Sequence, residues 1–142
     1  MKRSRQHTAW AATFATAAEL SRRGYDVTFT LGNTPRIDLL CAVPDGKLFK
    51  VQVKGISNSA AFYAQKEFFD TPMQIDLFLV VVLVPRDETT ELQFFILTHD
   101  EARREFEKMP KYKKDGRPYV DGFGLNWSSV KPYKDNWHSF PK

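Results

Sequence analysis

The chain opens with a pattern of apolar and polar positions that is typical of a helix. Residues 8–23 contain neither Gly nor Pro, are rich in Ala, and place Trp10, Phe14 and Ala17 on one stripe. This spacing predicts a helix over residues 8–23. Gly24 directly follows and supplies the residue type that most often ends a helix.

Alternation of side chains predicts strands next. Residues 25–30 alternate in character, which predicts one strand, and residues 36–43 and 47–54 predict two further strands. The last two segments are separated by Pro44-Asp45-Gly46, which has Pro and Gly where a tight turn requires them. The pattern therefore predicts a strand followed by a β-hairpin.

The second half of the chain predicts a buried strand, a further strand and a helix. Residues 62–69 give no clear pattern, whereas residues 74–84 are apolar on both faces, which is typical of a central strand. Residues 91–97 predict another strand. Thr98 and Glu101 have the spacing of a capping box, which opens a helix to about Met109.

After Pro110 the sequence is loop-like, with a short helix near residues 128–137 that Pro132 interrupts. There are no repeats and no linker, so residues 1–142 form a single domain. The order of the elements indicates an α/β fold, with helices packed around one mixed sheet.

Composition and charge add three expectations. Hydrophobic residues make up 42% and charged residues 27%, a globular composition without an apolar run long enough to span a membrane. The basic N-terminus is not followed by the apolar stretch of a secretory signal, and the single Cys41 excludes an intramolecular disulfide. A reducing, cytoplasmic location is the expectation.

The net charge of +4 comes entirely from the C-terminal segment, residues 111–142. Residues 1–110 carry 14 basic and 14 acidic side chains, whereas residues 111–142 carry 7 basic and 3 acidic ones, interleaved with aromatic residues. This mixture suits phosphate contact and base stacking, in which Lys113, Lys114 and Arg117 would take part. The alternative is a solvated tail whose aromatic side chains pack on the core.

Three polar side chains share one face of the predicted hairpin. If residues 43 and 47 pair across the turn, paired residue numbers sum to 90, and Asp38 lies opposite Gln52 with Lys54 diagonal to it. Cross-strand neighbours lie about 5 Å apart and diagonal ones about 7 Å. A carboxylate and an amide oxygen suit Mg²⁺, and a lysine beside them suits a phosphate under attack. The alternative is an Asp38–Lys54 ion pair on a wet sheet face, which stabilises by less than about 1 kcal/mol.

The hairpin also resembles the D…(E/Q)xK signature of the PD-(D/E)XK nuclease superfamily. The matching runs are Pro35-Arg36-Ile37-Asp38-Leu39-Leu40 and Val51-Gln52-Val53-Lys54-Gly55. The chain is most similar to small members with a QxK motif, which are related to Holliday-junction resolvases and to restriction and homing endonucleases. The resemblance implies a restriction-endonuclease-like mixed sheet flanked by helices. It also implies a Mg²⁺-dependent endonuclease, for which Mn²⁺ substitutes, with Asp38 and Gln52 as metal ligands and Lys54 as the catalytic lysine.

The sequence departs from that family in two places. Gln52 replaces an acidic ligand, which lowers the charge of the site. The Gly-Glu pair expected near the start of the first helix is replaced by Ala12 and Thr13, and Glu19 is the only carboxylate on this helix. Glu19 is either a second metal ligand or a structural acid.

Other candidates are weaker. Ser57, Asn58 and Lys66 follow the hairpin and could contact a phosphate, although polar residues are ordinary in a loop. The three histidines have no metal-ligand spacing, and Cys41 has the surroundings of a core residue.

Three functions remain open at this point. The first is an endonuclease that cuts DNA, as a homo-oligomer (dimer or tetramer) if the substrate is duplex, because one site nicks one strand. The second is a weakly active or inactive nuclease-fold module that binds nucleic acid or a protein partner. The third is a structural protein whose hairpin charges pair with each other.

Overall fold

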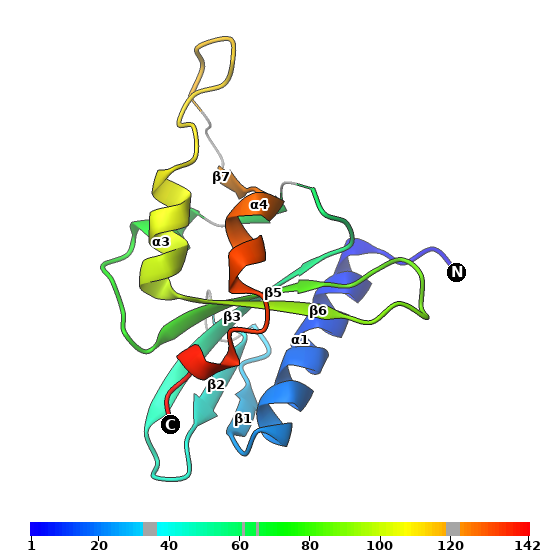
Figure 1. Ribbon diagram of the computed structural model, residues 1–142, viewed down its shortest axis with the longest axis vertical. Coiled ribbons are helices and arrows are strands. Elements are labelled where there is room, and N and C mark those ends of the chain that lie inside the picture. Colours follow the sequence, from blue (N-terminus) through cyan, green and yellow to red (C-terminus); the bar gives the residue numbers. More distant parts are fainter. Residues whose placement is uncertain (33–36, 61, 65, 119–122) are drawn as a thin grey trace.

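The computed structural model describes residues 1–32, 37–60, 62–64, 66–118 and 123–142 (Figure 1). The helices, including two short 3₁₀ turns, are α1 (Arg5–Arg22), α2 (Lys66–Asp70), α3 (His99–Glu107), α4 (Trp127–Val130), η1 (Lys131–Tyr133) and η2 (Trp137–Ser139). The strands are β1 (Asp26–Phe29), β2 (Leu39–Ala42), β3 (Leu48–Ile56), β4 (Phe62–Ala64), β5 (Leu77–Leu83), β6 (Gln93–Thr98) and β7 (Phe123–Leu125).

The main sheet has five strands in the order β1-β2-β3-β5-β6. The β3–β5 pair is parallel and the other pairs are antiparallel, so the sheet is mixed, as the sequence predicts. In the hairpin Leu39 pairs with Val51 and Cys41 with Phe49, and the Val43 N–H donates to the Lys47 carbonyl. The predicted hairpin register is therefore confirmed.

The core lies on both faces of this sheet. Every residue of β5 is buried, because the strand lies between β3 and β6 and is covered on both sides. Phe78, Val80 and Val82 pack toward α1, whereas Leu79 and Val81 pack toward the opposite side, which α3 and α4 cover. The molecule thus has three layers, with the sheet in the middle (Figure 1).

Two helix starts show how local chemistry sets the boundaries. The Thr98 and Glu101 capping box opens α3 as predicted. Helix α1 begins at Arg5, earlier than the predicted residue 8, because the Ser4 side chain accepts a hydrogen bond from the His7 N–H. The imidazole of His7 in turn contacts the Ser4 N–H, a reciprocal cap in which His replaces the usual Glu or Gln.

A second, two-stranded sheet was not predicted. Strands β4 and β7 pair in antiparallel register, with Phe62 opposite Leu125. Each has three residues, and about 60 residues separate them in sequence, so neither segment has the run of alternating side chains from which a strand is recognised.

The end of the C-terminal segment packs on the core. Phe140 is buried, the Tyr25 hydroxyl donates to the Pro141 carbonyl, and the Arg23 guanidinium lies 4.0 Å from the Trp137 ring centre. For Trp137 and Phe140 the structure therefore confirms the alternative in which aromatic side chains of this segment pack on the core. None of the described helices combines the length and the apolar character required to cross a membrane.

Candidate active site

The site forms where the β2–β3 pairing stops and β3 continues beside β5. The Asp38 N–H donates at 2.9 Å to the carbonyl of Val51, the residue that also pairs with Leu39, so the regular β2–β3 register ends here. The Asp38 carboxylate then accepts the Val53 N–H at 2.7 Å. The Asp38 side chain therefore accepts a hydrogen bond from β3 at the point where main-chain pairing between β2 and β3 ends.

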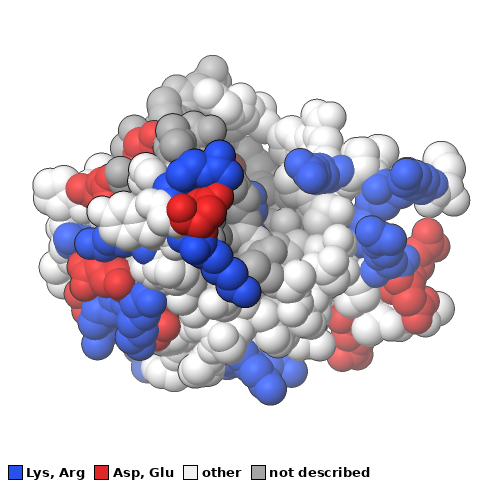
Figure 2. All heavy atoms as spheres, turned by 90° about the horizontal axis from the view of Figure 1, so that it is seen from above, with Lys and Arg blue, Asp and Glu red and all other residues white. Residues whose placement is uncertain are grey.

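Asp38, Gln52 and Lys54 line one cavity of about 730 Å³. Its polar lining residues are Arg5, Gln6, Thr8, Asp38, Gln52, Lys54, Ser57 and Asn58, and its apolar wall includes Phe62, Phe68, Phe69 and Leu79. Figure 2 looks down on the upper end of the molecule, where Lys and Arg side chains lie on both sides of a hollow in the surface. The structure therefore brings together five of the site residues predicted from sequence: Asp38, Gln52, Lys54, Ser57 and Asn58.

Gly55 brings the start of α1 to this cavity. A Cβ atom on Gly55 would lie 2.6 Å from the Thr8 carbonyl oxygen and 2.9 Å from the Ala12 Cβ. Only glycine permits so close an approach of helix and strand. As a result, Arg5 and Gln6, in the first turn of α1, face the cavity beside Lys54.

Burial shifts the pKa values of the two charged groups toward their neutral forms. Burial raises the pKa of the Asp38 carboxyl, while the Val53 N–H and the Lys54 ammonium oppose this shift. Burial and the nearby Arg5 charge lower the pKa of Lys54, and Asp38 opposes that change. No ion pair joins Asp38 to Lys54 in the described part of the chain, so the simple cross-strand salt bridge is not seen.

The donor atoms fit a hard divalent cation. The Gln52 Oε1 atom is buried and has no hydrogen-bond partner, although such an atom normally has one. It belongs to the same cavity as the Asp38 carboxylate, and oxygen ligands of these two kinds are those that Mg²⁺ prefers. No cluster of three His, Cys, Asp or Glu side chains suited to a metal occurs among the described residues, so Asp38 would be the one protein carboxylate in the set.

Glu19, for which the sequence left open a metal-ligand role and a structural role, does not line this cavity. It lies near the opposite end of α1 and forms ion pairs with Arg22 and Arg23, which lower its pKa. These contacts favour the structural alternative. The helix positions that face the cavity are also not Ala12 and Thr13: Ala12 is buried against the sheet, and the Thr13 hydroxyl donates to the Ala9 carbonyl.

The other predicted contacts lie elsewhere. Lys113, Lys114 and Arg117 belong to an exposed turn beyond α3, where Arg117 pairs with Asp115, and they do not line the cavity. Their contact with nucleic acid remains a prediction. The side chain of Lys66 lies outside the described parts of the structure.

Sequence reasoning missed Arg5 and Gln6. Both precede the predicted start of the helix, and neither is a residue type that the family signature requires. The signal that could have found them is Gly55, because a glycine within a strand indicates that another part of the main chain approaches closely.

Comparisons with known proteins give one informative likeness. No family model matches the chain, and the search of curated proteins finds no match either. Among solved structures, the bacterial homing endonuclease I-Ssp6803I superposes with a TM-score of 0.57, over 96% of this chain and 91% of that one. The two sequences are 18% identical. The likeness shows that this chain has the single-domain, nuclease-type α/β fold of that endonuclease.

Proposed function

We propose that the protein is a metal-dependent endonuclease of the PD-(D/E)XK type that hydrolyses phosphodiester bonds in DNA. The observation that carries this proposal is the convergence of Asp38, Gln52 and Lys54 in one cavity, with the Gln52 Oε1 atom buried and unpartnered. The fold shared with a bacterial homing endonuclease supports it.

The roles follow from the donor atoms. Asp38 and Gln52 would hold Mg²⁺ or Mn²⁺, which would supply Lewis-acid stabilisation of the phosphate and a more acidic bound water. Lys54, whose pKa burial lowers, orients the attacking water and stabilises negative charge that develops on the phosphate oxygens. Arg5 adds a second positive charge at the cavity.

The residues that line the cavity are partly polar and partly apolar. Phe62, Phe68 and Leu79 are apolar lining residues, whereas Arg5, Ser57 and Asn58 offer hydrogen-bond donors. A phosphodiester backbone is charged along its length, so its phosphate fits the donor side and the wall limits access of bulk water. Cutting both strands of a duplex would require two such sites, and hence a dimer or tetramer.

A second candidate is a binding module with little or no cleavage activity. The observation that favours it is the presence of one carboxylate, Asp38, where a metal ligand set commonly has more. This module would bind nucleic acid through the same cations, or a protein partner, without turnover.

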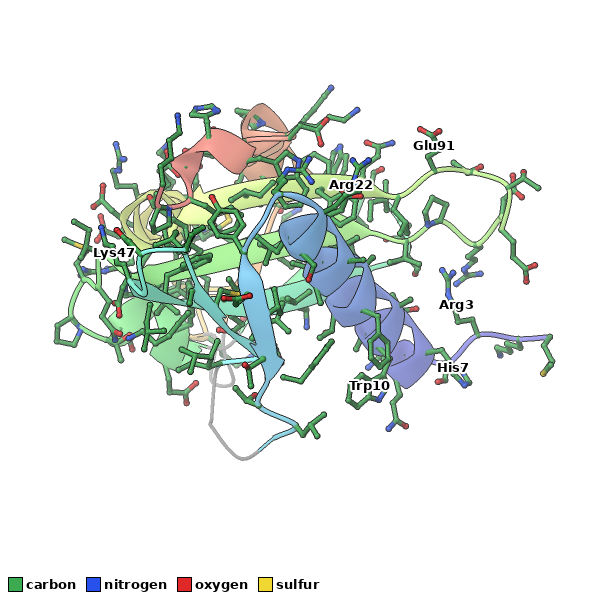
Figure 3. All side chains as sticks on the ribbon, turned by 90° about the horizontal axis from the view of Figure 1, so that it is seen from below. Arg3, His7, Trp10, Arg22, Lys47 and Glu91 are labelled. Carbon is green, nitrogen blue, oxygen red and sulfur yellow. The ribbon has the colours of Figure 1, made fainter. Side chains whose placement is uncertain are left out.

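The test is cleavage of labelled duplex, single-stranded and four-way-junction DNA in Mg²⁺, Mn²⁺ or EDTA. Asp38→Asn and Lys54→Met should abolish metal-dependent cutting. Lys47→Met is the matched control, because Lys47 is exposed in the hairpin turn away from the cavity (Figure 3). If the wild-type chain binds DNA with a steep salt dependence but does not cut it in either metal, the binding module is correct.

A further inference from the structure

The outer surface of α1 carries an exposed aromatic stripe, which we define as Trp10 and Phe14. Trp10 is 40% exposed and Phe14 is 55% exposed, and their rings stack with centroids 5.3 Å apart. Phe14 also contacts Phe29 of β1, at 5.4 Å between centroids. Figure 3 shows Trp10 projecting from the N-terminal part of α1. Aromatic side chains that stay exposed together in a folded chain usually mark a binding surface.

This stripe continues directly from the cavity. Gln6 lines the cavity, and Trp10 and Phe14 follow it at intervals of four residues, which places all three on one side of the helix. Each interval advances about 6 Å along the helix axis. A strand that leaves the cavity past Gln6 would therefore meet Trp10 first and Phe14 second.

The charge of the segment that carries the stripe favours a polyanion. Residues 1–18 contain Lys2, Arg3 and Arg5 but no acidic side chain. The first carboxylate of the chain is Glu19, which is paired with arginines near the far end of the helix. A negatively charged backbone would thus meet no carboxylate from this segment along its course.

We propose that the aromatic stripe stacks unpaired bases of the DNA strand whose backbone enters the cavity. This inference rests on the proposed function and names its substrate class: DNA with an unpaired stretch beside the cleaved bond. In a continuous duplex each base is covered by its neighbours, so an aromatic side chain has no free face to stack on. Unpaired bases offer both faces, and such stacking tolerates any sequence.

The alternative occupant of the stripe is a second copy of the chain. The two occupants differ in what they require of the side chains. Base stacking requires a planar ring, whereas an apolar contact between protein copies requires apolar area, part of which a leucine keeps. Substitutions that remove the ring but keep an apolar side chain therefore separate the two.

The experiment measures binding to fluorescent duplex, single-stranded and forked DNA by anisotropy in EDTA, where no metal-dependent cleavage occurs. The variants are Trp10→Leu/Phe14→Leu, which removes both rings, and Trp10→Phe/Phe14→Tyr, which keeps them. Leu48→Ala is the control, because Leu48 is 57% exposed and lies outside the cavity and the stripe. The double leucine variant should bind single-stranded and forked DNA about tenfold or more weakly, whereas duplex binding should change less than about twofold.

The ring-keeping variant and Leu48→Ala should bind all three DNAs as the wild type does. Equal losses for duplex and forked DNA, or no loss for either, would overturn the inference. A Trp10→Asp/Phe14→Asp variant with a lower mass than the wild type in light scattering, together with an unchanged DNA preference of the double leucine variant, would also overturn it and assign the stripe to contact between copies. A failure of the proposed function is distinguishable from these outcomes, because it would be observed as a lack of DNA cleavage by the wild-type protein in Mg²⁺ or Mn²⁺.

Discussion

Gly55→Ala should damage both stability and activity, because this residue sets the distance between α1 and β3. The added Cβ would lie 2.6 Å from the Thr8 carbonyl oxygen and 2.9 Å from the Ala12 Cβ, whereas ordinary contact begins at 3.4 Å. The Thr8 oxygen belongs to the main chain of α1, so no side-chain rotation relieves the contact. The start of α1 must move away from β3 by up to about 0.8 Å if it absorbs the whole strain.

The expected loss of folding stability follows from the size of this steric overlap. Overpacking of a core contact costs about 1–3 kcal/mol. For a chain of this length that corresponds to a fall of roughly 3–10 °C in Tm. Because α1 carries Arg5 and Gln6 to the cavity, DNA cleavage measured well below Tm should fall by more than the folded fraction does.

Thermal unfolding by circular dichroism and cleavage by the folded variant are the two measurements. Ala12→Gly is the informative second change, since it removes the contact at 2.9 Å but not the one at 2.6 Å, and costs about 1 kcal/mol in helix propensity by itself. The double variant should therefore remain unstable. An unchanged Tm in Gly55→Ala, or full recovery in the double variant, would refute the close-approach argument.

Three further outcomes are expected. Gln6→Glu adds a carboxylate to the cavity and should tighten Mn²⁺ binding about tenfold (1.4 kcal/mol), as measured by calorimetry. Thr13→Glu, outside the cavity, is the control and should leave the affinity for Mn²⁺ unchanged. Equal effects of the two substitutions would contradict the placement of the helix. Burial lowers the pKa of His99, whose Nδ1 accepts the Gln74 N–H, so the unfolded chain takes up a proton that the folded chain excludes. The free energy of unfolding should therefore fall as pH drops below about 6.5, and a urea midpoint that is constant from pH 7 to 5 would exclude this role. Burial raises the pKa of the Cys41 thiol to about 12, so iodoacetamide at pH 8 should label it only in urea, as mass spectrometry would show.

The hairpin and its polar face could be predicted because their determinants are local. The turn at Pro44-Asp45-Gly46 fixes the register of β2 against β3, and Asp38 and Gln52 then line the same cavity. The buried strand β5 was also recognisable, since a strand covered on both faces has no polar alternation.

The features of the fold and of the site that could not be predicted depend on contacts between distant segments. The position of α1 relative to the cavity follows from the Gly55 contact with Thr8, which no local pattern encodes. The pairing of β4 with β7 is of the same kind. The sequence left two roles open for Glu19, although its ion pairs were predictable, because arginines three and four residues later are ordinary helix ion-pair positions.

The hydrogen bond from the Val53 N–H to the Asp38 carboxylate has a consequence for how loss of activity should be interpreted. Alanine at position 38 would remove the proposed metal ligand and would also leave the partly buried Val53 N–H without its acceptor, at a cost of about 1–3 kcal/mol. Asparagine keeps an oxygen for that donor and removes only the negative charge. Related proteins that had lost cleavage activity would therefore still be expected to keep Asp or Asn at this position, because the Val53 N–H needs an acceptor. A carboxylate at this position is thus evidence for folding as much as for catalysis.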